Sequence, residues 1–282
     1  MRKQSTGRLF QGACMVKSWR EFSVAVRRRE TPFYDRIYKM AKWIRTLSVP
    51  CIKPLHSFLY LEWSFRTNLW HKFWRIIYYE PMFKSQCKKV GPGFRMEYAG
   101  NGTTRIRGDL QIYIGSNVTI FDNIFLVGLK VFDKPELYIG DNTYIAPNVH
   151  IFVGREIKIG NKCMIGSSII TDNPGHSVNY VMYRLEDSGG SPTPDSMRTV
   201  QIGDFCMIAV GTYIYPGVTI GDGVVARLGT HITHNIPPFC LVAGNPAKII
   251  RKLPIPEELI DVVGKERYES YLKSHESLDI KE

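Results

Sequence analysis

One histidine lies where its side chain could do chemistry, in the stretch TDNPGHSVNY at residues 171–180. His176 follows Asp172 by four positions, in a segment whose Pro, Gly, Asn and Ser residues predict a loop. An imidazole with a pKa of about 6.5 can accept a hydroxyl proton at neutral pH, so His176 is a candidate general base. The loop alone favours an exposed histidine without a catalytic task, which is the usual case for a histidine in a polar loop.

A catalytic imidazole needs a hydrogen-bond partner on its second nitrogen, because that bond fixes the tautomer. Asp172 and a backbone carbonyl of the loop are both candidates, and the sequence leaves both open. One positioned base contributes roughly 10²-fold to 10⁴-fold to a rate. The rest must come from holding the reactants together and from an oxyanion donor, which we expect among backbone N–H groups.

Aliphatic residues recur every six positions after residue 105, in the segments that must hold this loop. A helix cannot use that period, because its apolar positions would rotate around the axis, whereas short strands folded over a three-sided prism return to the same corner. We therefore predict a parallel β-helix with three hexapeptides in each turn. The recurring residues are Ile114, Ile120, Leu126 and Phe132, then Ile139, Ile145 and Ile151, then Ile159, Ile165 and Thr171, and finally Ile202, Ile208, Ile214, Ile220, Ala226 and Ile232.

A glycine follows many of these aliphatic residues, which is expected where a tight corner leaves little room for a Cβ atom. The stretch from Asn173 to Thr199 interrupts the repeat and predicts an excursion outside the prism. The glycines are Gly115, Gly140, Gly160, Gly166, Gly203 and Gly221.

Residues 216–253, PGVTIGDGVV through IPPFCLVAGNPAKIIRKL, resemble the end of a hexapeptide-repeat acyltransferase of the sugar and polysaccharide O-acetyltransferase type. The resemblance covers residues 105–253, and YYEPMFKSQCKKVGPGF at residues 78–94 is similar to the lead-in of polysaccharide-biosynthesis members. It implies a left-handed parallel β-helix that forms a homotrimer with active sites between subunits. It also implies acetyl-CoA as donor and a hydroxyl of a sugar or lipid-linked glycan as acceptor.

Site residues follow from this resemblance at matching positions. The family's D-x-x-x-H-S pattern falls on Asp172, His176 and Ser177, which implies that His176 is the general base and Asp172 its catalytic companion. Basic residues after the GNPA turn, Lys248 and Arg251, are implied to meet the phosphates of CoA. The slot for the rest of CoA is implied to include Ala209, Arg227 and Gly229.

The chain departs from the family pattern in the coils that would hold CoA. Met207 replaces a common Trp, and Arg227 with Leu228 replaces a Gly-Ala pair. Arg227 either contacts a phosphate or blocks the slot. A blocked slot would make the protein a non-catalytic trimeric scaffold, and an N-acetyltransferase acting on an amino sugar or nucleotide sugar would use the same fold and base.

We expect no metal. The resembled carbonic anhydrases of the hexapeptide class need two close histidines spaced H-x4-H, and Thr171 and Val181 occupy those positions around His176. His150, His231 and His234 are expected to be ordinary surface or core histidines.

The net charge of +11 is concentrated at the front of the chain. Residues 1–95 hold 20 Lys and Arg against 5 Asp and Glu, a balance of +15, and they show helical rather than hexapeptide spacing. We predict a helical region over 1–95, a β-helix over 96–253 with the loop 173–199, and a C-terminal helix and tail over 254–282. The front region could bind an anionic membrane surface or cap the prism, and we expect no nucleic acid.

Six scattered cysteines without paired spacing favour free thiols in a reducing compartment. The first twenty residues have no apolar segment typical of a secretory signal, and no window is long and apolar enough for a spanning helix. We therefore predict a cytoplasmic protein, peripheral on the inner face of the membrane if the front region docks there.

Overall fold

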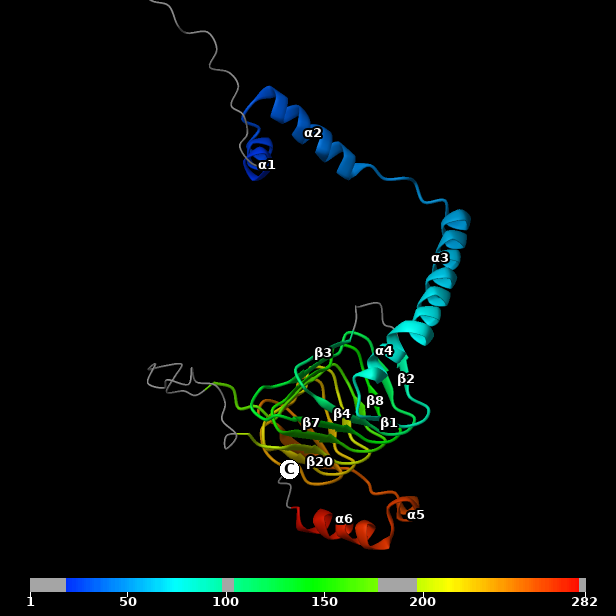
Figure 1. Ribbon diagram of the computed structural model, residues 1–282, viewed down its shortest axis with the longest axis vertical. Coiled ribbons are helices and arrows are strands. Elements are labelled where there is room, and N and C mark those ends of the chain that lie inside the picture. Colours follow the sequence, from blue (N-terminus) through cyan, green and yellow to red (C-terminus); the bar gives the residue numbers. More distant parts are fainter. Residues whose placement is uncertain (1–18, 98–103, 177–196, 279–282) are drawn as a thin grey trace, which may run out of the picture. The chain divides into compact units, whose positions relative to one another are not determined.

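The computed structural model describes residues 19–97, 104–176 and 197–278, and the chain divides into two compact units, Met1–Phe65 and Arg66–Glu282 (Figure 1). The first unit contains helix α1, Trp19–Arg28, and helix α2, Pro32–Thr46. Thr31 ends the short connection and caps α2, since its Oγ1 accepts the N–H of Tyr34 at 3.2 Å. Helix α3, Lys53–Trp74, crosses the boundary between the units.

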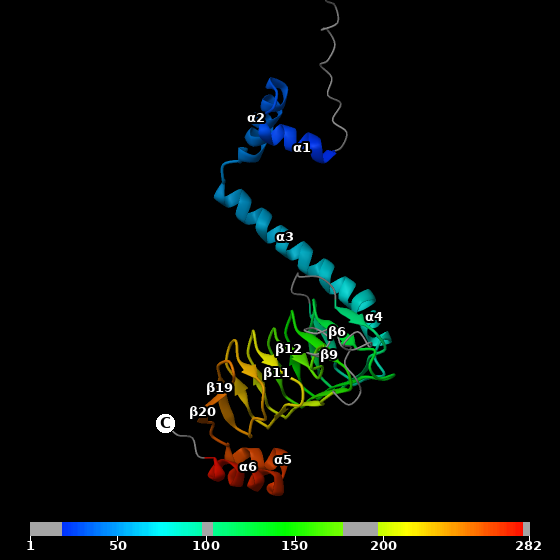
Figure 2. The same ribbon diagram turned by 90° about the vertical axis from the view of Figure 1, so that its left-hand side faces the viewer.

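The second unit is a prism of three sheets of parallel strands, wound as a left-handed β-helix, and one antiparallel strand ends sheet B (Figure 2). Sheet A contains β1 (Lys89–Val90), β4 (Gln111–Ile114), β7 (Glu136–Ile139), β10 (Glu156–Ile159), β13 (Val200–Ile202) and β16 (Thr219–Ile220). Sheet B contains β2 (Arg95–Glu97), β5 (Thr119–Phe121), β8 (Tyr144–Ile145), β11 (Met164–Ile165), β14 (Met207–Ile208), β17 (Val225–Ala226), β19 (Cys240–Ala243) and β20 (Lys248–Lys252). Sheet C contains β3 (Arg105–Arg107), β6 (Phe125–Gly128), β9 (His150–Val153), β12 (Ile169–Thr171), β15 (Tyr213–Ile214) and β18 (His231–Ile232).

The core is the column of aliphatic residues predicted from the period of six. Ile202, Ile208 and Ile214 come from sheets A, B and C of one coil, and each is at most 3% exposed. The next coil repeats them in register, with Ile220 beside Ile202 and Ile232 beside Ile214. Each fully buried isoleucine stabilises the prism by about 1.5–3 kcal/mol, so the repeat accounts for most of the hydrophobic stabilisation.

Close packing between coils explains the corner glycines. A Cβ atom on Gly140 would lie 2.6 Å from the carbonyl carbon of Gly160 in the next coil. A side chain at that position would therefore force adjacent coils apart. This short distance agrees with the prediction that the tight corner leaves little room for a Cβ atom.

A ladder of short polar side chains lines the corner between sheets A and B. Asp204 accepts the backbone N–H of Asn161, and Asp222 accepts that of Asp204, both at 2.7 Å. Helix α6, Lys265–Ser277, ends the ladder, since Arg267 donates to Asp204 at 2.8 Å and to Asp222 at 2.7 Å. The C-terminal helix therefore lies alongside the last coils (Figure 2).

Two short elements at each end of the prism connect it to the longer helices. A π-helix, η1 (Arg75–Tyr79), leads into α4 (Glu80–Ser85), whose Phe83 is buried and stacks on Phe94 of the first coil at 5.5 Å between ring centres. The first coil is thus covered by α4, and residues 66–95 cluster with the prism. At the other end, a 3₁₀ turn (Glu257–Leu259) and α5 (Ile260–Val263) precede α6.

Candidate active site

Asp172 lies at the corner between sheets C and A, directly after β12, where the predicted loop leaves the prism. Its side chain is fully buried. Oδ1 accepts the N–H of Gly154 at 2.5 Å, while Oδ2 accepts those of Arg155 at 2.6 Å and Glu156 at 2.9 Å. Burial raises the pKa of Asp172 above its ordinary value, and the three N–H donors act against that rise.

The same corner fixes both ends of the loop. The N–H of Arg198 donates to the carbonyl of Asp172 at 3.3 Å, so the returning chain is hydrogen-bonded to the departing one. Met197 is buried over the turn, where a Cβ atom on Gly154 would lie 2.4 Å from its sulfur. Asp172 therefore holds the base of the loop in place.

His176 is exposed and is the last described residue of the segment that leaves the prism after β12. Two hydrogen bonds shape the segment before His176. The N–H of Gly175 donates to Oδ1 of Asn173 at 2.9 Å, and the N–H of Asn173 donates to Oγ1 of Thr171 at 3.0 Å. The hydroxyl of Ser177 and the rest of the predicted loop up to residue 196 lie outside the described residues. The catalytic assignments of His176 and Asp172 stay predictions.

The residues predicted to hold CoA lie at the corner between sheets B and C, apart from Arg251, which lies on the edge strand of sheet B. The N–H of Ala209 donates to Ala226 at 3.0 Å and that of Arg227 donates to Val242 at 2.9 Å, which stacks Ala209, Arg227 and Ala243 along the prism axis. Lys248 lies opposite Ala243 across the β19–β20 pair, and Arg251 lies opposite Leu241. The side chains of Arg227, Lys248 and Arg251 are all exposed.

Gly229 lies at the same corner, where its backbone conformation forms the turn. It has a φ of +70°, in the left-handed region that glycine adopts without strain, and nothing lies within 4 Å of a Cβ atom placed there. The chain therefore turns toward sheet C and leaves an open surface beside Arg227. Val210 and Leu228, which flank it, are 53% and 73% exposed.

The two corners lie on opposite edges of sheet C. His176 follows the end of β12, while Ala209 and Gly229 precede the starts of β15 and β18, which belong to the same sheet. One prism therefore brings the CoA candidates together and keeps His176 away from them.

Sequence reasoning left the outer face of sheet C without a role. Tyr213 stacks on His231 with ring centres 4.6 Å apart, and the hydroxyl of Tyr215 lies 3.3 Å from Nδ1 of His231. These rings lie on the outer face of sheet C, between the two corners. The signal available in the sequence was an aromatic or imidazole side chain next to Ile151, Ile214 and Ile232.

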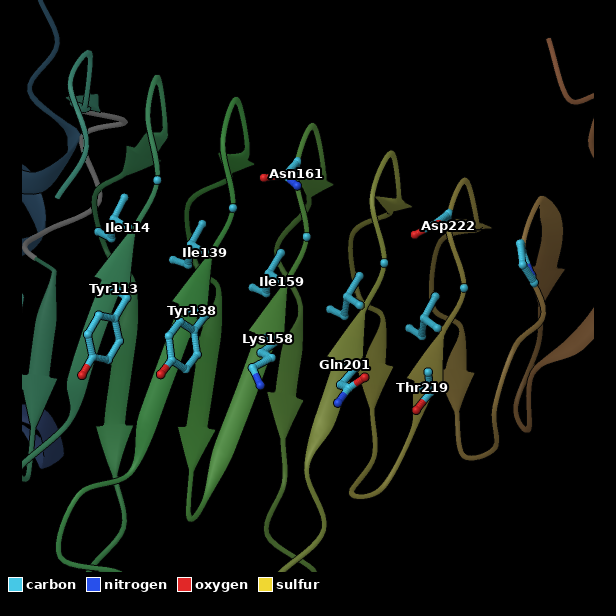
Figure 3. A pocket seen from close by; sticks show the side chains of 18 of the residues that line it. Tyr113, Ile114, Tyr138, Ile139, Lys158, Ile159, Asn161, Gln201, Thr219 and Asp222 are labelled. Carbon is cyan, nitrogen blue, oxygen red and sulfur yellow. The ribbon is translucent and has the colours of Figure 1, made fainter. Parts of the chain in front are cut away.

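Sheet A carries a separate shallow groove of about 720 Å³ that contains none of the predicted site residues (Figure 3). Tyr113 and Tyr138 stack with ring centres 4.7 Å apart, and Lys158 lies 5.4 Å from the centre of the Tyr138 ring. Burial, together with the bond from its hydroxyl to Glu136 at 3.0 Å, raises the pKa of Tyr138 to about 12. Within the described part of the chain, no group of three His, Cys, Asp or Glu residues could hold a metal ion.

Comparison with known proteins places this geometry in context, although no protein-family model matches the chain. The chain is 32% identical over 156 residues to "Putative lipopolysaccharide biosynthesis O-acetyl transferase WbbJ" of Escherichia coli K12, covering 52% of this chain and 74% of that protein. It is 31% identical over 117 residues to the galactoside O-acetyltransferase of the same strain, covering 42% and 54%.

A solved structure shares the fold. The N-acyltransferase AntD from Bacillus cereus, in complex with dTDP and 3-hydroxybutyryl-CoA, matches with a TM-score of 0.51 and 21% identity, covering 70% of this chain and 96% of that one. The stacked hexapeptide coils, and a relative matched over three quarters of its length, lead to one conclusion: the chain belongs to the hexapeptide-repeat acyltransferase family.

Proposed function

We propose that the protein transfers an acetyl group from acetyl-CoA to a hydroxyl of a sugar in polysaccharide or glycolipid assembly, with His176 as general base. The observation that carries the proposal is the loop base that Asp172 anchors four residues before His176. The relative with 74% coverage is an O-acetyl transferase named for lipopolysaccharide biosynthesis, which favours a sugar hydroxyl as acceptor.

In this proposal the imidazole of His176 accepts the hydroxyl proton as the oxygen attacks the thioester carbonyl carbon. The carbon–sulfur bond then breaks, and the protonated imidazole returns the proton to the departing thiolate. Asp172 acts as a positioning residue, because its carboxylate is committed to the turn at residues 154–156. Arg227 and Lys248, both exposed at the far corner, supply positive charge for the phosphates of CoA.

The site would be complete only in a trimer. Three triangular prisms arranged around a threefold axis with sheet C facing inward bring the His176 corner of one subunit to the Ala209 corner of the next. The opposite placement of the two corners on sheet C supports this arrangement. So do Val210 and Leu228, whose apolar side chains are more than half exposed at the corner that would meet a neighbour.

We also propose that the helical front region makes peripheral contact with an anionic membrane on its cytoplasmic face. The charge of +15 over residues 1–95 supports this, as do the aromatic side chains of α3, which has no buried residue. Trp63 and Trp70 are 53% and 59% exposed. Among the described residues, every helix is too short or too polar to cross a bilayer.

Calorimetric titration of acetyl-CoA tests the donor before any acceptor is known. We expect saturable binding by the wild-type protein, by His176→Ala and by the control His234→Ala. Release of the CoA thiol in the presence of a panel of glycans should then fail for His176→Ala alone. Absence of acyl-CoA binding by the folded protein would refute the enzyme and favour a scaffold whose slot Arg227 and Leu228 close.

A further inference from the structure

Helix α2 carries an apolar stripe that the structure leaves in solvent. Its exposed members are spaced seven, four and three residues apart, so they share one face of the helix. α1 packs against the other side of α2, where Tyr34 meets Phe22 edge-on at 5.8 Å and Ala41 is half-buried. The exposed members are Phe33 at 65%, Met40 at 55%, Ile44 at 54% and Leu47 at 59%, with Trp43 beside them at 62%.

Positive charge surrounds this stripe. Helices α1 and α2 with their connection, residues 19–46, have eight Lys and Arg against three Asp and Glu, a balance of +5. Asp35, the single acid in α2, is neutralised by Lys39 at 2.7 Å and by Arg29 at 3.8 Å. In the described residues no ion pair involves Arg36, Lys42 or Arg45, whose side chains are exposed.

These cations change the electrostatic environment of a neighbouring tyrosine, Tyr38. A hydrogen bond from Arg29, together with the charges of Arg29, Lys42 and Arg45, lowers the pKa of Tyr38 below its ordinary value. The guanidinium of Arg29 lies 4.2 Å from the centre of the Tyr38 ring. The unit therefore combines an exposed apolar face with excess positive charge.

Charge decides which occupant suits the stripe. A second copy of α2 would place two helices of net charge +3 against each other, and the repeat covers two heptads, fewer than a coiled coil needs. A nucleic acid would use the cations and leave the apolar face in water. An anionic bilayer satisfies both, because its phosphates meet Lys and Arg while apolar side chains enter the headgroup boundary.

We propose that α2 docks in the plane of an anionic membrane, with Met40, Trp43 and Ile44 entering the lipid and Arg36 and Arg45 meeting headgroup phosphates. This inference deepens the membrane contact proposed above and assigns it to one helix face. It is independent of acyl transfer, since all of its residues lie in the first unit.

Sedimentation of the full-length protein with vesicles tests the assignment. Wild-type protein should bind phosphatidylcholine–phosphatidylglycerol vesicles and not vesicles of phosphatidylcholine alone. Met40→Ser with Ile44→Ser should lower the partition coefficient on the order of 100-fold, since two large apolar side chains no longer enter lipid. A matched control, Val262→Ser with Leu272→Ser, removes two exposed apolar side chains from the C-terminal helices and should bind as wild type.

Charge is tested separately with Arg36→Gln and Arg45→Gln together, which should lower binding to the anionic vesicles roughly 30-fold at low salt. If both α2 variants bind like wild type while substitutions in α3 abolish binding, the membrane contact stands and this assignment is wrong. If wild-type protein binds no vesicle, the membrane contact itself fails, and acetyl-CoA titration still reports on acyl transfer. Self-association without lipid that Met40→Ser and Ile44→Ser abolish would make a second copy the occupant and overturn the proposal.

Discussion

The backbone N–H of Gly154 donates to Oδ1 of Asp172 at 2.5 Å, across the corner from which the His176 segment leaves the prism. Two further N–H groups of the same turn point at Oδ2. A buried carboxylate that receives three consecutive backbone donors serves as a structural anchor. The spacing of four residues between Asp172 and His176 thus links a fixed point of the fold to the candidate base.

Asp172→Ala should lower the free energy of unfolding by about 2–4 kcal/mol, because three N–H groups lose their acceptor in a buried turn. Asp133→Ala, at an exposed carboxylate, should change it by less than about 0.5 kcal/mol. Denaturant unfolding measures both. Asp172→Asn should separate anchoring from binding by lowering kcat while acetyl-CoA affinity is kept. Unchanged stability in Asp172→Ala would rule out the anchor.

Arg227→Ala should weaken acetyl-CoA binding about 10-fold to 100-fold if the guanidinium meets a phosphate, the usual effect of losing a charge-assisted hydrogen bond. Leu228→Ala, at the adjacent exposed position, should leave affinity unchanged. Calorimetry distinguishes the two ideas about Arg227, since tighter binding after either substitution would mean that these side chains obstruct the slot.

Complementation tests the intersubunit site. His176→Ala and Ala209→Trp should each be inactive, the first through loss of the base and the second through a blocked slot. Co-expressed subunits assort at random, so about one quarter of the interfaces should combine an intact His176 with an intact slot and restore that share of activity. Mixed trimers without activity would place the whole site in one chain, in conflict with the opposite corners of sheet C.

The repeating part of the fold could be predicted from the sequence because its contacts repeat with it. Ile202, Ile208 and Ile214 could be recognised as core residues from their spacing alone. The register between coils follows once one coil is known. The exception in the first run is Phe132, which keeps the spacing but lies in the turn between β6 and β7. An insertion shifts the register there without changing residue type.

Contacts between segments without a common period could not be predicted. Nothing in the spacing of Asp172 indicates that it bonds to residues 154–156, because that pairing depends on where the corner of the preceding coil lies. Helical spacing correctly predicted helices around Ile44 and Leu69, yet it gave no information about whether their apolar faces would be covered. In the structure both side chains are more than half exposed.

Thiol reactivity should follow burial. Cys51 is exposed, whereas Cys163, Cys206 and Cys240 are buried, and burial raises the pKa of Cys240 to about 11. Because the thiolate is the reactive form, iodoacetamide at pH 8 should modify Cys51 quickly and leave Cys240 unmodified in the folded protein. Peptide mapping by mass spectrometry measures both sites. Rapid labelling of Cys240 would contradict the packing of the last coil.

Arg267→Ala should destabilise the end of the prism, because Arg267 bridges the carboxylates of Asp204 and Asp222, at 2.8 and 2.7 Å. Those carboxyl side chains are only 14% and 13% exposed, so their mutual repulsion is weakly screened once the guanidinium is gone. Bonds to both aspartates raise the pKa of Arg267 and oppose the effect of its burial, so it stays charged at any working pH. Since its side chain is 43% exposed, solvent limits the expected loss to about 1–2 kcal/mol.

The control is Lys265→Ala, which removes an ion pair 3.9 Å long at a side chain that is 80% exposed, and this substitution should leave stability unchanged. Thermal unfolding of the three proteins measures the difference, and equal midpoints would mean that α6 is held by the packing of Tyr271 against Phe239 instead.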